Sequence, residues 1–348
     1  MKVLIIGNMG YVGPGVVARF RQKFPDADIT GFDTGYFAHS LTDVKRLPES
    51  LLNRQIFGDV RHFPADLLNG MDVVVYLAAI SNDPMGAQYE EVTLEVNWRS
   101  AVRIAEQSRE KGVSKFVFAS SCSMYGAADD QPKKETDSLN PLTAYARSKV
   151  FAERDLEPLA GDGFTVTCLR FATACGLSNR LRLDLVLNDF VAGAVTSGEI
   201  NILSDGTPWR PLINVLDMAV AIEWASTRSP ENGGAFLAVN TGSNRWNYQV
   251  RELAEAVASV VPGCKVSINE NAEPDKRSYK VNFDLYEKLA PEHQPQFQLE
   301  QTINNLYEGL KRMNFGNRDF RNSQLIRLKV LEAHRSNGLL NDELIWIS

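Results

Sequence analysis

Short apolar runs alternate along the chain with longer stretches in which apolar residues recur every three or four positions. In the first half, the short runs lie at 3–6, 29–32, 55–58, 73–77, 116–119 and 166–170. Continuous apolar runs bounded by Gly or Asp are typical of strands that are buried on both faces of a parallel sheet. The stretches 12–24, 92–111 and 144–159 between them have the spacing of crossover helices. The pattern predicts an α/β fold with a doubly wound parallel sheet.

The rhythm changes after about residue 176. Helical spacing appears at 181–196, 216–226, 249–261 and 323–336, and a turn sequence interrupts 200–209. We expect two parts. Residues 1–176 would form the doubly wound domain, to which a segment near 211–244 returns. Residues 177–348 would form a smaller mixed α/β lobe with a C-terminal helical extension.

Composition and charge exclude several classes of protein. The 348 residues are 44% hydrophobic and carry a formal net charge of -6 without a dense Lys/Arg run, which argues against a nucleic-acid or anionic-membrane binder. The four cysteines lack C-x-x-C spacing, so neither a zinc site nor a disulfide framework is indicated, and we expect no metal. Because the apolar runs are too short for a signal-peptide core or a membrane span, we expect a cytoplasmic protein.

A glycine-rich turn directly follows the first predicted strand and opens the first predicted helix. In residues 7–13 (GNMGYVG), the glycines allow backbone N–H groups to approach a pyrophosphate, and the helix N-terminus adds positive potential. A tight structural turn is the alternative. The candidate cofactor contacts are Gly7, Gly10, Tyr11, Val12 and Gly13.

Acidic and small residues follow the next strands in the order that a dinucleotide site requires. Asp33 stands 20 residues after Gly13, where a carboxylate can accept both ribose hydroxyls and would repel a 2′-phosphate, so NAD is favoured over NADP. An ordinary strand-end carboxylate is the alternative. Further candidate cofactor contacts are Asp59, Val60, Leu77, Ala78 and Ala79.

A row of hydroxyls and a Tyr–Lys pair supply candidate redox chemistry. Residues 120–123 end a predicted strand, and Tyr145 and Lys149 lie one turn apart on one face of a predicted helix. A phenol is a poor base at neutral pH unless a nearby ammonium and a positive nicotinamide lower its pKa. The pattern therefore favours oxidation of a carbinol, and an exposed helix face is the alternative for the pair taken alone.

Together these motifs resemble the extended short-chain dehydrogenase/reductase family, in the branch that acts on nucleotide-linked sugars, from residue 1 to about 289. The family implies a Rossmann domain that binds NAD, a smaller C-terminal substrate lobe, and transient oxidation of a sugar hydroxyl. By match to its motifs, Tyr145 would be the base, Lys149 would hold the nicotinamide ribose, and Ser121 would hydrogen-bond the reacting oxygen. Asn97 resembles the family's helix asparagine near the active site.

The resemblance extends to a nucleoside-diphosphate sugar as substrate. Arg210 resembles the arginine that grips the diphosphate, although Pro211 replaces the usual Asp after it, and Arg277 resembles the later arginine in this role. Two guanidiniums on one diphosphate make physical sense, because each offers permanently charged, bidentate donors. A surface salt bridge is the alternative for either. Asn188 resembles the asparagine that contacts the nucleotide phosphates.

Departures from the family pattern bear on the reaction. Sugar 4,6-dehydratases carry an Asp-Glu pair where this chain has Cys122 and Ser123, so dehydration is disfavoured, and a hydroxyl at Ser123 resembles the 4-epimerases. Thr173, a further candidate substrate contact, replaces the usual asparagine. Arg180 and Arg182 are unlike the common epimerase pattern and would either meet a sugar substituent or form salt bridges at the rim.

We therefore expect an NAD-dependent nucleotide-sugar epimerase, most simply at carbon 4. A net nucleotide-sugar reductase or dehydrogenase is the first alternative, and a non-catalytic NAD-binding module is the second. We also expect a homodimer, because the helices at 92–111 and 144–159 carry apolar residues beyond one sheet-facing stripe, including Val150, Phe151 and Leu156.

Overall fold

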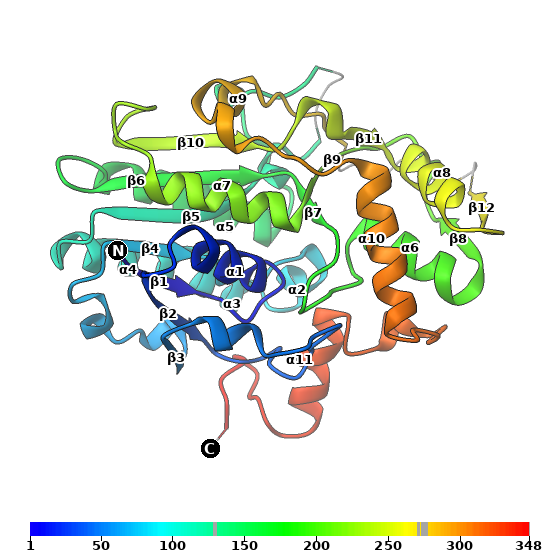
Figure 1. Ribbon diagram of the computed structural model, residues 1–348, viewed down its shortest axis with the longest axis horizontal. Helices are drawn as coiled ribbons and strands as arrows, with labels where there is room; N and C mark the ends of the chain where they lie inside the picture. The colour runs from blue at the N-terminus through cyan, green and yellow to red at the C-terminus, as the bar shows by residue number, and fades with distance from the viewer. Residues whose placement is uncertain (128–130, 270–271, 273–277, 348) are drawn as a thin grey trace.

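Seven parallel strands form the central sheet of the protein, in the order β10-β6-β5-β4-β1-β2-β3 (Figure 1). The structure is a computed structural model and describes residues 1–127, 131–269, 272 and 278–347. The strands are β1 (Lys2–Ile6), β2 (Asp28–Asp33), β3 (Arg54–Phe57), β4 (Val73–Tyr76), β5 (Lys115–Ser121), β6 (Thr165–Phe171) and β10 (Phe236–Thr241). The predicted doubly wound sheet is confirmed.

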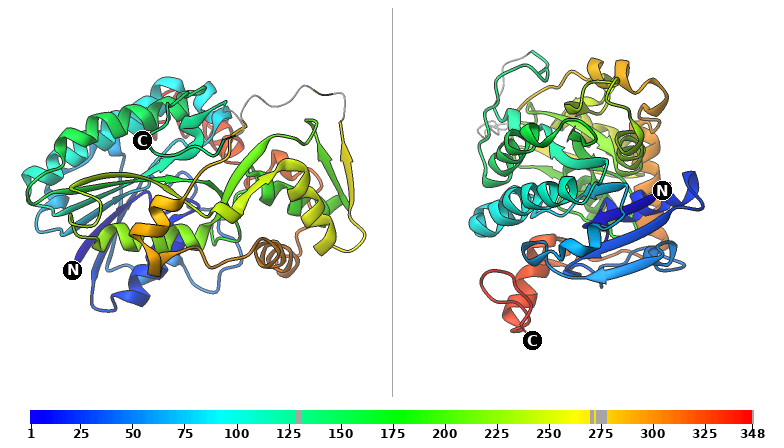
Figure 2. Two further views of the ribbon diagram at one scale, coloured as in Figure 1. Left: turned by 90° about the horizontal axis from the view of Figure 1, so that it is seen from above. Right: turned by 90° about the vertical axis from the view of Figure 1, so that its left-hand side faces the viewer.

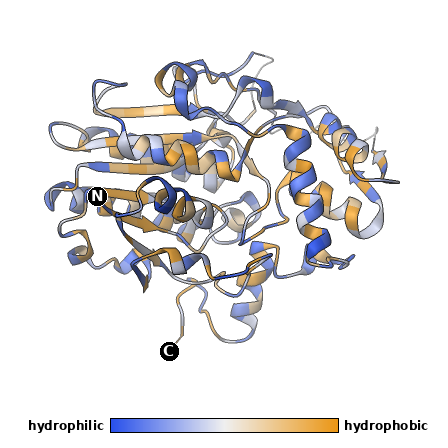
Figure 3. Cartoon of the chain, in the orientation of Figure 1, coloured by the Kyte–Doolittle hydropathy of each residue, from blue (hydrophilic) through white to orange (hydrophobic). Residues whose placement is uncertain are grey.

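Helices cover both faces of this sheet because its strands are apolar on both faces. Val3 and Ile5 pack into one core cluster, and Leu4 and Ile6 pack into another on the opposite face. Figure 3 shows the strands as largely hydrophobic. One face holds α1 (Gly13–Lys23) and α7 (Val215–Thr227). The other holds α2 (Asp83–Gln88), α3 (Glu90–Leu94), a π-helical turn (Glu95–Arg99), α4 (Ser100–Glu110) and α5 (Ala144–Leu156).

Two residues that we expected at a subunit interface behave differently in helix α5. The Phe151 ring lies partly buried against Trp98, with ring centroids 5.0 Å apart. Leu156, in contrast, is fully buried within the core on this face of the sheet. Leu156 is therefore unable to contribute to an interface, and that part of the expectation is wrong.

The second lobe protrudes beyond the carboxyl ends of the central strands (Figure 2). A three-stranded sheet of β11 (Asn247–Gln249), β9 (Trp209–Asn214) and β7 (Thr173–Cys175) leads into it, and β8 (Glu199–Ile202) pairs with β12 (Lys265–Ile268). Helices α6 (Val186–Ser197), α8 (Val250–Val260) and α10 (Leu299–Arg312) pack together around a third core cluster. Helix α9 (Asp284–Leu289) packs beside β10 in the first domain.

Two predicted helices begin later than their apolar spacing indicates. The helix expected at 181–196 is α6, which begins at Val186, because Leu181 and Leu183 donate backbone hydrogen bonds to Thr42 and Leu325 and hold the preceding residues outside the helix. The helix expected at 323–336 is α11 (Arg327–Ser336), preceded by a turn closed by the hydrogen bond from Ile326 N to Ser323 O.

Residues 323–347, the C-terminal segment, run beneath strands β2 and β3 rather than along the second lobe (Figure 1). Leu331, Leu340 and Leu344 are buried in the same core cluster as Phe32 and Tyr36 of the first domain. The division expected at residue 176 assigns this segment to the second part of the chain. Leu325, near its start, does pack into the third cluster in the second lobe, whereas the three leucines that follow complete the core of the first domain. No helix within the described residues is long and apolar enough to cross a membrane.

Candidate active site

One cavity of about 1060 Å³ extends from the glycine-rich turn after β1, past the end of β5, into the second lobe. The carboxyl ends of the parallel strands open into it, which is where ligands bind in doubly wound sheets. Most of the residues that the sequence singles out line this cavity. They are Gly7, Gly10, Tyr11, Val12, Asp33, Asp59, Val60, Leu77, Ala78, Ala79, Ser121, Ser123, Tyr145, Lys149, Thr173 and Arg210.

The three glycines of the turn meet different structural requirements. Gly7 has a φ of +88°, and a Cβ there would lie 2.5 Å from the backbone nitrogen of Ala78. At Gly13 a Cβ would lie 1.9 Å from the backbone oxygen of Asn8. Gly13 does not line the cavity, so its expected cofactor contact is replaced by a packing role inside the turn. Gly10 lines the cavity and leaves the backbone open to a ligand.

Asp33 closes strand β2 with its carboxylate held by backbone donors. Its oxygens accept hydrogen bonds from Met9 N at 2.9 Å and from Gly35 N at 2.8 Å. Burial raises the pKa of Asp33, and these two hydrogen bonds lower it in part. A carboxylate placed beside an open glycine-rich turn fits a dinucleotide whose adenosine ribose carries two free hydroxyls.

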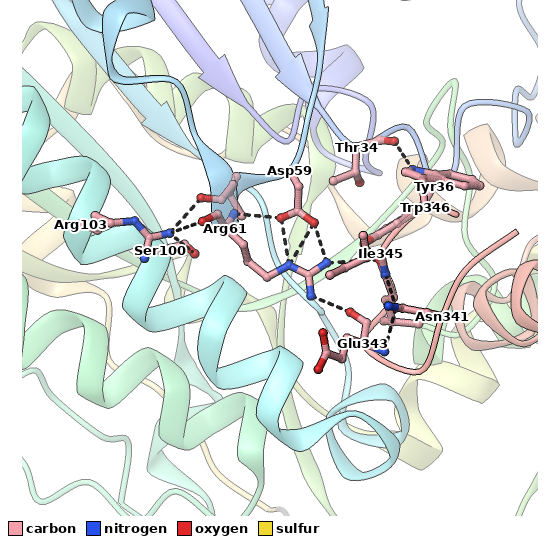
Figure 4. A network of polar contacts seen from close by, with 12 residues as sticks. Thr34, Tyr36, Asp59, Arg61, Ser100, Arg103, Asn341, Glu343, Ile345 and Trp346 are labelled. Atoms are coloured by element: carbon pink, nitrogen blue, oxygen red, sulfur yellow. Dashed lines mark hydrogen bonds and ion pairs between the residues drawn. The ribbon is translucent and has the colours of Figure 1, made fainter. Parts of the chain in front are cut away.

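Asp59 is paired within the protein rather than free to meet the adenine. Both of its oxygens contact Arg61, whose Nε lies 3.0 Å from each of them. The Arg61 guanidinium also donates to the backbone oxygens of Glu343 and Leu344 in the C-terminal segment (Figure 4). Asp59 lines the cavity, but its carboxylate is bound by Arg61, which links the turn after β3 to the C-terminal segment.

The expected catalytic hydroxyls converge at the end of β5 and the start of α5. Ser121 Oγ donates to Ser123 Oγ at 3.0 Å and accepts from Ser123 N at 3.2 Å. The Tyr145 side chain is hydrogen-bonded to Ser121. Lys149 Nζ donates to the Ala119 backbone oxygen at 2.7 Å and lies 5.6 Å from the Tyr145 ring centroid. The structure thus brings together the four residues that the sequence assigns to catalysis.

Burial dominates the ionisation of this group. It raises the pKa of Tyr145, an effect that the hydrogen bond with Ser121 opposes. It also lowers the pKa of Lys149 to about 7. Removing both groups from water favours their neutral forms, and the expectation that Lys149 and a positive nicotinamide together lower the pKa of the phenol stays a prediction.

Two asparagines that were expected to contact ligands are fully buried outside the cavity lining. The Asn97 side chain bonds both backbone groups of Ile80, at 2.8 and 3.0 Å, so it holds the turn after β4 rather than meeting the cofactor. Asn188 accepts from Gly176 N at 2.9 Å and donates to the Tyr11 hydroxyl at 3.1 Å, which uses its amide to join the lobe to the glycine-rich turn. Both expected ligand contacts are therefore wrong.

The substrate side of the cavity contains part of the expected set. Thr173 and Arg210 line it, and one Arg210 Nη donates to the Trp209 backbone oxygen at 2.9 Å. Arg277 lies outside the described residues. The structure therefore leaves the second expected diphosphate contact undescribed.

The sequence left the roles of Arg180 and Arg182 open and did not indicate that Arg327 lines the cavity. Arg182 lines the cavity and pairs with Asp184 at 2.7 Å, while one Nη donates to Ser81. Its unusual position in the sequence was a usable signal. Arg327, at the start of α11, also lines the cavity, and nothing local in the sequence indicates this. Arg180 forms a salt bridge with Glu49 at 2.7 Å.

The described part of the chain contains no cluster of three or more His, Cys, Asp or Glu side chains that could hold a metal ion. The residues present fit a dinucleotide instead: the open glycine-rich turn for the phosphates, Asp33 for the ribose and Lys149 at the opposite end.

Comparisons with known proteins agree with this geometry. A UDP-glucose 4-epimerase of Streptococcus mutans is 24% identical over 319 residues, which cover 83% of this chain and 94% of that protein. The structure of MoeE5 in complex with UDP-glucuronic acid and NAD has a TM-score of 0.75 at 25% identity and covers 90% of this chain and 100% of that one. TunA, an NAD-dependent NDP-hexosamine 5,6-dehydratase, has the same TM-score at 22% identity and covers 89% and 98%, which shows a shared fold.

The sequence model described as the NAD dependent epimerase/dehydratase family matches residues 3–242, about two thirds of the chain. The match spans the glycine-rich turn, Asp33, the serine row and the Tyr145–Lys149 pair. The resemblance inferred from these motifs is confirmed, and the chain belongs to the NAD-dependent epimerase/dehydratase family, whose members act on nucleotide sugars.

Proposed function

We propose that this protein is a nucleotide-sugar epimerase that inverts carbon 4 of its substrate by transient oxidation to a keto-sugar. The observation that carries the proposal is the group formed by Ser121, Ser123, Tyr145 and Lys149, together with a thiol and a hydroxyl, Cys122 and Ser123, where a dehydratase needs an acid and a base. Cys122, the remaining side chain in this run, is fully buried and donates to the Arg170 backbone oxygen at 3.0 Å, away from the cavity.

Three residues of the group would act on the substrate or the cofactor, and Ser123 is hydrogen-bonded to one of them, Ser121. The cavity would hold NAD between the glycine-rich turn and Lys149, and the nicotinamide would supply the hydride acceptor and donor for the sugar carbon. Tyr145 removes the hydroxyl proton as the carbon is oxidised and gives it back on reduction. Ser121 hydrogen-bonds the reacting oxygen, and Lys149 holds the nicotinamide ribose. Arg210, on the lobe side of the same cavity, would bind the substrate diphosphate.

Retention of the keto-sugar separates epimerisation from net redox turnover. A substrate that is oxidised and reduced within one binding event consumes no external cofactor. The test is incubation of the purified protein with UDP-glucose, UDP-galactose and UDP-glucuronic acid without added NAD, with products identified by proton NMR and absorbance followed at 340 nm. The 4-epimer, formed without net absorbance change, supports the proposal.

A matched pair of variants controls this experiment. Tyr145→Phe should abolish product formation, whereas Tyr89→Phe, which changes a tyrosine outside the cavity lining, should retain it. Formation of NADH in proportion to substrate would replace the proposal with a net dehydrogenase. Loss of water from the sugar would replace it with a dehydratase.

A further inference from the structure

Arg327 is a buried cation in the wall of the cofactor cavity. It is the first residue of α11, it lines the cavity, and only 1% of it is exposed. Its guanidinium lies 4.5 Å from the ring centroid of Phe37, and one Nη donates to the Arg180 backbone oxygen at 2.6 Å. The side chain therefore reaches from the C-terminal segment into the first domain.

The charge of Arg327 is only partly balanced by the protein, because the Asp184 carboxylate that acts on it forms its ion pair with Arg182. Among the described residues no carboxylate forms an ion pair with it, and its Nη1 has neither a hydrogen-bond acceptor nor access to solvent. The neighbouring guanidiniums are matched, since Arg180 pairs with Glu49 and Arg182 with Asp184.

A buried guanidinium without an ion pair is costly, and an anion bound beside it offsets part of that cost. Burial lowers the pKa of Arg327 to about 9, together with the positive charges of Arg182 and Arg180, and the Asp184 carboxylate opposes this shift in part.

The position of Arg327 indicates which bound anion would lie next to its guanidinium. Phe37 follows β2 and its terminal Asp33, on the side of the cavity where the adenosine ribose is expected, and Tyr11 of the glycine-rich turn lines the same cavity as Arg327. Arg210, the expected contact of the substrate diphosphate, comes from β9, which leads into the second lobe. We propose that Arg327 is the counter-charge for the diphosphate of the bound dinucleotide, supplied to the first domain by the C-terminal segment.

The C-terminal segment is anchored where it needs to be for this role. Trp346 Nε1 donates to the Thr34 backbone oxygen at 2.8 Å, and the Tyr36 hydroxyl donates to the Leu344 backbone oxygen (Figure 4). His334 Nε2 lies 2.9 Å from the Tyr36 backbone oxygen. These contacts attach both α11, through His334, and the end of the C-terminal segment, through Leu344 and Trp346, to the residues that follow Asp33. Arg327, the first residue of α11, is thereby held beside the cofactor cavity.

The test uses two variants of Arg327 that keep most of the side-chain volume and differ in whether the charge is kept. Arg327→Met removes it, and Arg327→Lys keeps it without the planar fork. Lys329→Met is the matched control, because it removes a cation from the same helix that already pairs with Glu332 at 2.9 Å. The full-length holoenzyme is loaded with labelled NAD, and displacement is measured with NAD, ADP-ribose and adenosine, together with the melting temperature with and without NAD.

We expect Arg327→Met to lose affinity selectively for ligands that carry the diphosphate. Hydrogen bonds to charged groups contribute about 1.5–3 kcal/mol, so NAD and ADP-ribose should bind Arg327→Met roughly 10- to 150-fold more weakly. Adenosine, which has no phosphate, should compete as it does in the parent. The NAD affinity of Arg327→Lys should lie between that of Arg327→Met and that of the parent, and the NAD affinity of Lys329→Met should equal that of the parent.

A purely structural role would give a different pattern. If Arg327 only held α11 in place, the ligand-free variant would have a lower melting temperature, and its affinities for adenosine and for NAD would both fall. That result would overturn the proposal. Unchanged NAD binding combined with weaker binding of UDP to the holoenzyme would assign the charge to the substrate instead. The proposal expects the ligand-free Arg327→Met protein to melt no earlier than the parent and to gain less stability from NAD.

Discussion

Lys149 provides a quantitative test of how strongly the site is shielded from water. Its ammonium is buried beneath the cavity, and burial lowers its pKa to about 7. In the unfolded chain the same group has its ordinary pKa of about 10.4. Replacing it by Met keeps the length of the side chain and removes the ionisable group.

The sign of the effect follows from which state holds the proton. Below pH 7 Lys149 is charged in both states, and the cost of burying the charge is fully present. Between pH 7 and about 10.4 the unfolded chain keeps the proton that the folded protein has lost, so the free energy of unfolding rises with pH. At about 1.36 kcal/mol per pH unit, the gain from pH 7 to 9.5 is roughly 3 kcal/mol.

The assay is urea denaturation of the parent and of Lys149→Met at intervals from pH 6 to 9.5, after bound NAD has been removed. The buried thiols Cys168 and Cys175 have raised pKa values and oppose the trend at high pH. Cys175 is unchanged in both proteins and cancels in the difference, whereas Cys168 interacts with Lys149, so both proteins carry Cys168→Ala. The parent should gain about 3 kcal/mol relative to the variant. A difference that stays flat across this range would show that Lys149 keeps its charge on folding, and the argument from burial would be refuted.

Four further predictions address the remaining roles. Tyr145→Phe should lower turnover by about 10²- to 10⁴-fold while NAD content after purification stays that of the parent, and normal turnover would place the base elsewhere. Asp33→Asn should reduce the preference for NAD over NADP in titrations with both, whereas an unchanged ratio would leave Asp33 as a structural acceptor for Met9 and Gly35. Arg210→Ala should raise the apparent constant for UDP about 10- to 150-fold with NAD binding intact, and normal UDP binding would remove it from the diphosphate site. If helices α4 and α5 form a two-fold interface, sedimentation should show a dimer that Phe151→Glu converts to monomer; a parent that sediments as a monomer would contradict this.

The fold could be predicted from the sequence because its strands are apolar on both faces. The side chains of the run Val3–Ile6 pack alternately into two core clusters, one on each face of the sheet. This is a property of a central strand that is covered on both faces. The glycine-rich turn and Asp33 could be located for a related reason. Their spacing is fixed by one strand, one helix and the next strand, so local sequence distance determines where they meet.

The buried asparagines show where motif matching reaches its limit. Asn97 and Asn188 stand at positions that resemble ligand contacts, yet their amides bond backbone groups of Ile80 and Gly176. A motif specifies residue type and approximate location, whereas the direction of a side chain depends on which backbone groups around it lack a partner. Arg327 could not have been found in this way at all, because its neighbours Phe37 and Arg180 are brought to it only by the tertiary fold.

The path of the C-terminal segment has a consequence for the order in which the protein is completed during synthesis. Tyr36 and Leu344, which are hydrogen-bonded, are separated by 308 residues. At roughly 5–20 residues per second, this separation corresponds to about 15–60 s of elongation. The surface that Leu331, Leu340 and Leu344 cover stays exposed during that time. The domain that emerges first is thus finished last, and stable loading with dinucleotide is expected to follow the emergence of residues 327–347 rather than that of the glycine-rich turn.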